Sequence, residues 1–155
     1  MFLDIKSEIK KVYHNRLLET EKQVEEFEQA LKNIYEYDEV SIIKDLMLAF
    51  DDNTENHEVM FNLVHTIEHL YKNKIEEGLK LIANSVPIII DYGREWIEIL
   101  HYRILNHPQV RMIYAKVLRD IDIKARNIIK DLLEDIKRED PELFSDSVDE
   151  VLGSI

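Results

Sequence analysis

The chain has 155 residues, a net charge of −12 from 32 acidic and 20 basic residues, and no cysteine. This length suits one domain with its own core, and the lack of cysteine excludes disulfides, thiolate metal sites and cysteine nucleophiles. The negative balance disfavours a nucleic-acid binder, because that class normally carries a basic face.

Leader and membrane segments are not apparent in the sequence. The N-terminal stretch MFLDIKSEIKK is charged within four residues and lacks the apolar core of a signal peptide. The longest apolar run is short, far below the ~20 residues that cross a bilayer. We therefore expect a cytoplasmic protein without a membrane partner.

Helical periodicity dominates the N-terminal half, where only short polar links interrupt it. Apolar stripes predict four helices, with these positions facing inward: Ile5, Ile9, Val12 and Tyr13; Val24, Phe27, Leu31 and Ile34; Val40, Ile43, Leu46, Met47 and Phe50; Val59, Met60, Leu63, Val64, Ile67 and Leu70. Asp38 is the expected N-cap of the third helix, and Asn56 or Thr54 that of the fourth. The stretch HNRLLET is either a break between the first two helices or a continuation.

The C-terminal half continues in the same way. KNKIEEGLKLIANSV predicts a helix that ends before Pro87, and REWIEILHYRIL predicts one with Trp96, Ile99, Leu100 and Ile104 inward. VRMIYAKVLRD and IDIKARNIIKDLLEDIKRE follow, and a short helix after Asp140-Pro141 precedes Gly153. Apolar segments recur at intervals of 36 and 33 residues. The sequence therefore predicts an all-α domain of seven or eight helices, arranged as stacked antiparallel hairpins of HEAT-like type or as an irregular bundle.

Acidic residues are concentrated in two blocks. Residues 45–71 contain six acidic residues and no Lys or Arg, and residues 139–155 contain six acidic residues and no basic residue. The first block is a candidate docking surface for a basic partner. The second is interpreted as an acidic C-terminal tail at the periphery of a single domain spanning residues 1–155.

The stretch HTIEH, residues 65–69, spells the H-x-x-E-H zinc motif of inverzincin peptidases. His65 and His69 share one helical face, and Glu68 stands where a general base is needed. A third ligand would have to come from downstream acids such as Glu139, Glu142 or Asp146. Peptidases of this type are much larger, and apolar Ile67 and Leu70 flank the pair. We therefore expect neither a metal site nor a catalytic one.

Other constellations give no support for an enzyme. The loop DDNTEN has alternating oxygen ligands, but an EF-hand needs Gly at its sixth position and Glu at its twelfth, where this chain has Asn56 and Asn62. No phosphate loop, nucleotide fingerprint or Ser/His/Asp arrangement occurs, so no cofactor is expected. Trp96 is interpreted as a core anchor, with an interface anchor as the alternative. Exposed contacts are expected at Tyr35 and Tyr37, and ion pairs of Arg94 and Arg103 with Glu95, Glu98 or the acidic loop.

Two stretches, FDD-x-T-E-x-H-E-V-M-F from Phe50 and W-x-x-x-L-x-x-R-I-L-N from Trp96, resemble the immunity protein 30 family of bacterial polymorphic toxin systems. The resemblance implies a helical protein that is encoded beside a secreted toxin and protects the producer by binding it. It brings no catalytic residue. The positions that match the family's pattern are Asp51, Asp52, Glu55, His57, Glu58, His65, Glu68, Trp96, Arg103 and Asn106.

The leading functional hypothesis is therefore a non-enzymatic immunity protein that neutralises a cognate, basic toxin domain by stoichiometric binding. The candidate toxin-binding residues are Asp51, Asp52, Glu55, His57, Glu58 and Glu68. Asp51 and Asp52 have a structural alternative, in which they cap a helix or pair with Arg103. The rival functions are a helical-repeat adaptor for another protein partner and an H-x-x-E-H metal-dependent hydrolase. The toxin's activity, the stoichiometry and the oligomeric state stay open.

Overall fold

The computed structural model describes residues 3–155, and all regular structure in this range is helical. The elements are α1 (Ile5–His14), α2 (Glu21–Tyr37), the 3₁₀ helix η1 (Val40–Ile42), α3 (Ile43–Leu46), the 3₁₀ helix η2 (Met47–Ala49), α4 (His57–Tyr71), α5 (Ile75–Leu105), α6 (Pro108–Asp120), α7 (Ile123–Glu139) and α8 (Pro141–Gly153). The prediction of an all-α fold with seven or eight helices is confirmed. Within residues 3–155, no helix is long and apolar enough to cross a membrane.

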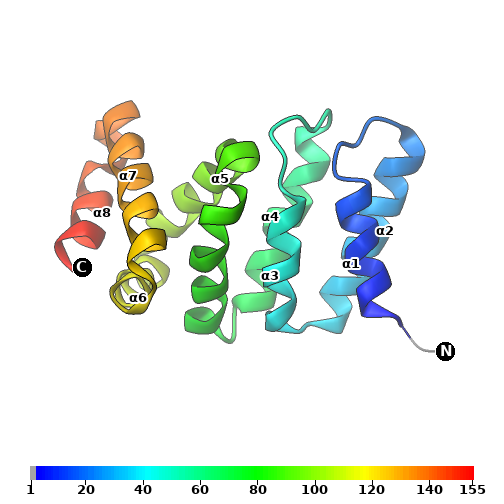
Figure 1. Ribbon diagram of the computed structural model, residues 1–155, viewed down its shortest axis with the longest axis horizontal. Helices are drawn as coiled ribbons and strands as arrows, with labels where there is room; N and C mark the ends of the chain where they lie inside the picture. The colour runs from blue at the N-terminus through cyan, green and yellow to red at the C-terminus, as the bar shows by residue number, and fades with distance from the viewer. Residues whose placement is uncertain (1–2) are drawn as a thin grey trace.

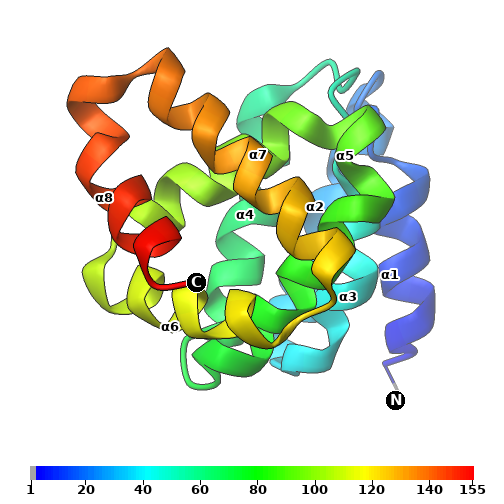
Figure 2. The same ribbon diagram turned by 60° about the vertical axis from the view of Figure 1, so that its left-hand side comes forward.

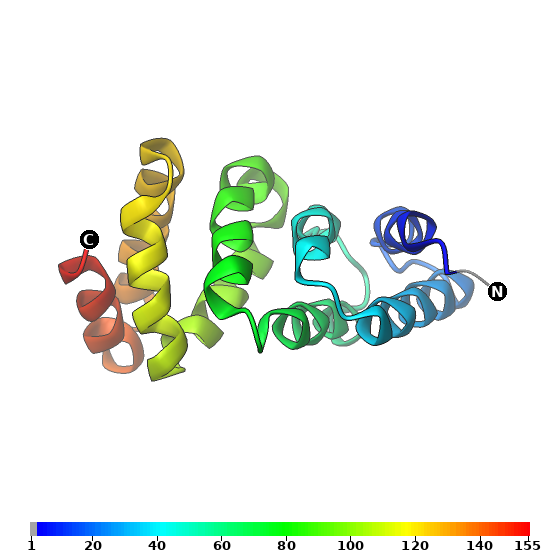
Figure 3. The ribbon, with the colours of Figure 1, turned by 90° about the horizontal axis from the view of Figure 1, so that it is seen from below.

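The helices form a stack in which each helix packs mainly on helices one or two places away in the chain. In Figure 1 they follow one another along the long axis, from α1 and α2 at one end to α8 at the other. The hairpin of α1 and α2 packs on α3, η2 and α4, and these pack on α5, which in turn contacts α6 and α7. Figure 3 shows α1 and α3 in one row and α2 and α4 in the other. The arrangement is thus a stack of antiparallel hairpins.

The acidic C-terminal segment forms helix α8 at the end of this stack. Figure 2 shows α7 lying over α5, with α8 beside α6. Phe144, Val148 and Val151 lie at positions i, i+4 and i+7 of α8, and all three are buried. Asp140 begins the helix by accepting a hydrogen bond from the Leu143 N–H group. The segment is therefore a packed helix whose acidic residues face solvent.

Most of the apolar stripes read from the sequence are buried, but Tyr13 is an exception. Phe27, Ile34, Leu46, Met60 and Leu63 are inaccessible to solvent, whereas the Tyr13 side chain is 39% exposed. Tyr13 lies next to the buried Val12, and α1 packs mainly on α2, α3 and η2. The apolar stripe expected on α1 is therefore wider than the surface that these elements cover.

Helix ends in the N-terminal half depend on side-chain caps. HNRLLET is a break, because α1 ends at His14 and Thr20 caps α2 by accepting from the Gln23 N–H. Asn56 caps α4 as predicted, accepting from the Val59 N–H at 3.0 Å. The prediction for Asp38 is wrong. Asp38 ends α2 in the left-handed conformation, with φ 56° and ψ 54°, which Asp tolerates better than most residues.

The prediction that a helix ends before Pro87 is also wrong. Helix α5 passes through Pro87, and its interruption lies at Gly93, whose φ of −124° and ψ of 22° are not helical. A proline inside a helix costs about 3 kcal/mol. The buried stripe of Leu79, Ile82, Val86 and Ile89 continues across the proline. Since burial of each such side chain contributes about 1.5–3 kcal/mol, packing outweighs the local cost.

A buried polar pair joins α5 to α6. His101 and Tyr114 are both inaccessible to solvent. The His101 Nδ1–H donates to the Ile97 carbonyl oxygen at 2.7 Å, so the unprotonated Nε2 accepts from the Tyr114 hydroxyl at 2.6 Å. Burial lowers the pKa of His101 to about 4 and raises that of Tyr114. Both groups are thus held neutral in the folded protein.

We predict that Gly78→Ala destabilises the fold. A Cβ at position 78 would overlap the Cβ of Tyr71, because the first turn of α5 packs directly on the last turn of α4. Gly→Ala in an open helix gains about 1 kcal/mol, whereas overpacking here should cost about 1–3 kcal/mol in the free energy of unfolding. Urea unfolding measures the difference. The control is Gly153→Ala, where a Cβ meets no atom within 4 Å, and equal stability of the two variants would contradict the close packing.

We also predict that stability falls as the pH is lowered from about 6.5, because His101 takes up its proton more readily in the unfolded chain. The unfolded state binds this proton near pH 6.5 and the folded state only near pH 4. The loss attributable to His101 should therefore reach about 2 kcal/mol at about pH 5. Urea unfolding of the wild type and of His101→Gln across this range isolates the effect. Parallel pH profiles for the two proteins would show that His101 is not buried neutral.

Candidate functional site

The acidic loop, residues 50–56, packs against the interruption of α5 at Gly93. The Asp52 N–H donates to the Tyr92 carbonyl oxygen at 2.8 Å, and Asp52 Oδ1 accepts from the Glu95 N–H at 3.0 Å. The interruption frees the N–H groups that begin a new helical segment. Asp52 therefore acts as an N-cap supplied by a distant part of the chain.

The electrostatic setting of Asp52 is that of a partly desolvated cap. Burial raises the pKa of the Asp52 carboxyl, and the negative charges of Glu95 and Asp51 act in the same direction. Hydrogen bonds from the Glu95 and Trp96 N–H groups oppose them. Since desolvation is the largest contribution, the site disfavours the charged form of the carboxyl relative to water.

Asp51 holds the other side of the loop. Its side chain is buried, accepts from the Asn53 N–H at 2.9 Å, and pairs with Arg16 Nε at 3.3 Å. The Glu55 N–H donates to the Leu17 carbonyl oxygen at 2.9 Å. These bonds tie the loop to the connection between α1 and α2. The alternative that Asp51 and Asp52 are structural is therefore supported, although neither pairs with Arg103.

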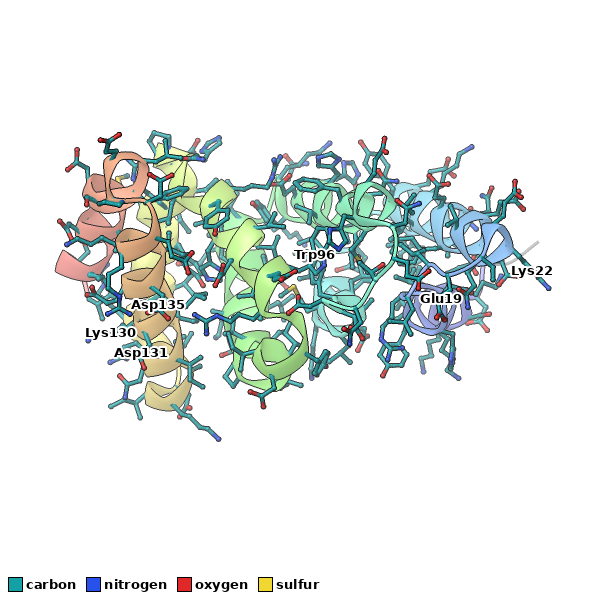
Figure 4. All side chains as sticks on the ribbon, turned by 90° about the horizontal axis from the view of Figure 1, so that it is seen from above. Glu19, Lys22, Trp96, Lys130, Asp131 and Asp135 are labelled. Carbon is teal, nitrogen blue, oxygen red and sulfur yellow. The ribbon has the colours of Figure 1, made fainter. Side chains whose placement is uncertain are left out.

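Close approach of backbone to backbone explains Gly93. A Cβ there would lie 3.0 Å from the Phe50 carbonyl oxygen, so the residue leaves room for the loop. Trp96, one helical turn further along, is 2% exposed, and the rings of Phe50, Phe61 and His57 surround it at 5.6–6.0 Å between centroids. Figure 4 shows Trp96 in the interior of the stack. The core-anchor interpretation of Trp96 is confirmed.

The polar side chains of HTIEH have separate partners. Glu68 accepts two hydrogen bonds from Arg103, one from Nε at 2.7 Å and one from Nη2 at 2.9 Å. His69 lies 3.3 Å from Asp38 and stacks on Tyr35, and the exposed His65 ring meets the edge of Phe61. In the chain from residue 3 onward, no group of three or more His, Asp or Glu side chains is arranged to hold a metal ion. The motif serves here in contacts between helices.

Of the six candidate toxin-binding residues, Glu55, His57 and Glu58 have exposed side chains. Asp51 and Asp52 are engaged within the fold, and the partly exposed Glu68 is paired with Arg103. The structure thus gathers five of the six at the acidic loop and the first turn of α4, whereas Glu68 lies about 15 Å further along that helix. Only Glu55, His57 and Glu58 are left open. Contact of any of them with a toxin stays a prediction.

Sequence reasoning missed the residues that position the loop. Arg16 and Gly93 come from distant segments, and the only local signal was a glycine inside a helical pattern. The expected pair of Arg94 with Glu98 is confirmed at 3.0 Å. Arg94 also reaches Asp135 of α7 at 2.7 Å, a link that joins the site's helix to the next layer. Asp135 is labelled on α7 in Figure 4.

Comparison with known proteins gives one match. The family model described as Immunity protein 30 matches residues 14–114. This range holds α2 to α5 and most of α6, and with them the acidic loop, Arg16, Gly93 and Trp96. No curated protein and no solved structure matches the chain.

We predict that Asp52→Ala lowers the free energy of unfolding by about 1 kcal/mol, the usual cost of losing an N-cap. Asp52→Asn should retain most of the stability, because Asn caps as well as Asp and the site raises the pKa of the carboxyl. Urea unfolding measures both variants, with Asn53→Ala, an exposed neighbour in the same loop, as control. If Ala and Asn were equally harmless at position 52, the capping role would be wrong.

Proposed function

We propose, since the chain belongs to the Immunity protein 30 family, that it binds a bacterial toxin and neutralises it. The match over residues 14–114 is the observation that carries this proposal, and the family's description favours a non-enzymatic role. In the proposed mechanism, a stoichiometric complex blocks the toxin inside the producing cell's cytoplasm, and the inhibitor undergoes no chemical change. The toxin is expected to be encoded beside this protein's gene.

The contact face proposed for the toxin is the exposed part of the acidic loop and the first turn of α4. It contains Glu55 and Glu58, neither of which has an ion-pair partner among the described residues. The Glu55 N–H donates to the Leu17 carbonyl oxygen, and this bond brings the exposed Glu19 region to the same edge of the stack. This edge is uppermost in Figure 1. Unpaired acidic side chains at one edge favour a basic partner.

Electrostatics explains how such a face would act. The net charge of −12 attracts a basic toxin over a distance, and the field is screened beyond about 8 Å at physiological salt. Complementary charge raises the association rate and suppresses wrong partners more than it raises affinity. The bonds of Asp51 and Asp52 hold the face in place before binding, so little ordering entropy is lost on association.

We predict that Glu55→Lys/Glu58→Lys weakens binding of the neighbouring gene's toxin domain by at least about tenfold, mostly through a slower association rate. Binding is measured by surface plasmon resonance at several salt concentrations, and protection by co-expression with the toxin. The matched control is Asp131→Lys/Glu134→Lys on α7, which makes the same charge change away from the loop. Figure 4 shows Asp131 at the opposite end of the molecule from Glu19. Equal effects of the two double variants would contradict the proposed face.

A helical-repeat adaptor is the second candidate, favoured by the way in which each hairpin packs chiefly on its neighbours. Such stacks present extended surfaces to protein partners. Capture of the native partner by this protein separates the two functions. A partner that arrests growth when expressed alone, and does not when co-expressed with this protein, supports immunity. A partner without toxicity supports the adaptor.

A further inference from the structure

A groove with an apolar floor crosses the face formed by α1, α3, η2 and the first half of α5. It consists of two adjoining hollows of about 330 and 260 Å³. Leu48 of η2 and Asp45 of α3 line both hollows, so the two hollows adjoin at these residues. Figure 3 shows α1, α3 and the first half of α5 side by side in one row. We call this feature the α1–α5 groove.

Two helical stripes form its walls. Helix α1 contributes Ile9 and Tyr13, and α5 contributes Leu81 and Ile88. The lining of each wall extends over eight residues, from 6 to 13 and from 81 to 88, which is two helical turns or about 10 Å. Both helices contact η2, whose single turn lies between them. The groove thus has the length and the apolar lining that suit a short helix of a partner.

Several apolar side chains in and beside the groove are exposed to solvent. The Ile88 side chain is 59% exposed and that of Tyr13 39%. Tyr92, one turn beyond Ile88, is 38% exposed. Its carbonyl oxygen is fixed by the Asp52 N–H, and Arg16 lies 4.2 Å from the centre of the Tyr13 ring. The acidic loop's anchors therefore also hold the aromatic end of the groove.

The groove's rim is basic, unlike the molecule as a whole. Lys6, Lys10 and Lys44 line it, against one acid, Asp45. Within residues 3–155, none of these three lysines forms an ion pair, whereas Lys11 on the other side of α1 pairs with Glu8. Three free ammonium groups around an apolar floor stand out in a chain of net charge −12.

We propose that the α1–α5 groove docks an acidic amphipathic helix of a partner protein. Apolar side chains of that helix, spaced three to four residues apart, lie on Leu48 between Tyr13 and Ile88, and its flanking carboxylates meet Lys6, Lys10 and Lys44. A lipid surface fits less well, because the apolar residues line a hollow that the face of a bilayer does not fill. This surface is separate from the acidic loop's exposed face, and the inference does not rest on the toxin proposal.

The test uses a fluorescein-labelled model helix of 14 residues with Leu at positions 3, 7 and 10 and Glu at most others, and a matched peptide with Lys in place of Glu. Anisotropy measures affinity, and backbone amide shifts of the ¹⁵N-labelled protein locate the peptide. We expect the acidic peptide to shift resonances of α1, η2 and residues 75–92, and to bind at least about tenfold more tightly than the basic one. Anionic vesicles are the third probe.

Matched variants make the result specific. Ile88→Glu should weaken binding of the acidic peptide at least about tenfold. Ile123→Glu, at a similarly exposed isoleucine on α7, should leave this binding unchanged. Lys6→Glu/Lys10→Glu should weaken binding of the acidic peptide as Ile88→Glu does. The control is Lys22→Glu/Lys130→Glu, which makes the same charge change at the two ends of the molecule, where Figure 4 shows Lys22 and Lys130.

Three results would overturn the proposal: no binding at about 1 mM acidic peptide, shifts centred outside the groove, or vesicle binding without peptide binding. None of these measurements involves the toxin. The groove and the acidic face therefore stand or fail separately.

Discussion

The bond from Asp52 to the interrupted α5 is the contact on which the middle of this molecule depends. An interruption inside a long helix leaves backbone N–H groups without partners, and a side chain that caps such a segment contributes about 1 kcal/mol. Asp52 satisfies the Glu95 N–H, and its own N–H returns a bond to Tyr92. Gly93 makes this possible, since any side chain there would press on the Phe50 backbone.

This contact also fixes the position of the N-terminal hairpin. Asp51, adjacent to the cap, pairs with Arg16, and Glu55 bonds to Leu17. The loop thus joins three layers of the stack and adds to the apolar packing and to the Glu68–Arg103 pair between α4 and α5. Because apolar packing has little directional preference, these polar bonds set the relative orientation of α1, α4 and α5.

The acidic block illustrates how charge in one stretch of sequence divides between two tasks. Asp51 and Asp52 hold the loop, whereas the exposed Glu55 and Glu58 are free for a partner. The positions that match the family's pattern include both kinds, so a shared pattern by itself does not identify a binding residue. On another face of the same stack, free lysines surround an apolar floor. A short η2 between two longer helices creates that hollow, and the acidic loop anchors its aromatic end.

The sequence predicted the helical class, most of the buried stripes and the Asn56 cap, because periodicity and capping are local properties. It also carried the family resemblance. It misplaced Asp38, which ends α2 in the left-handed conformation. It also placed a helix end before Pro87, where packing of a continuous stripe overrode a local signal. It identified Asp51, Asp52 and Glu68 as candidates but not their partners. Arg16 lies 35 residues from Asp51, and Glu95 lies 43 residues from Asp52. Only the tertiary structure brings such groups together, because no local pattern encodes which distant N–H or guanidinium a carboxylate will meet.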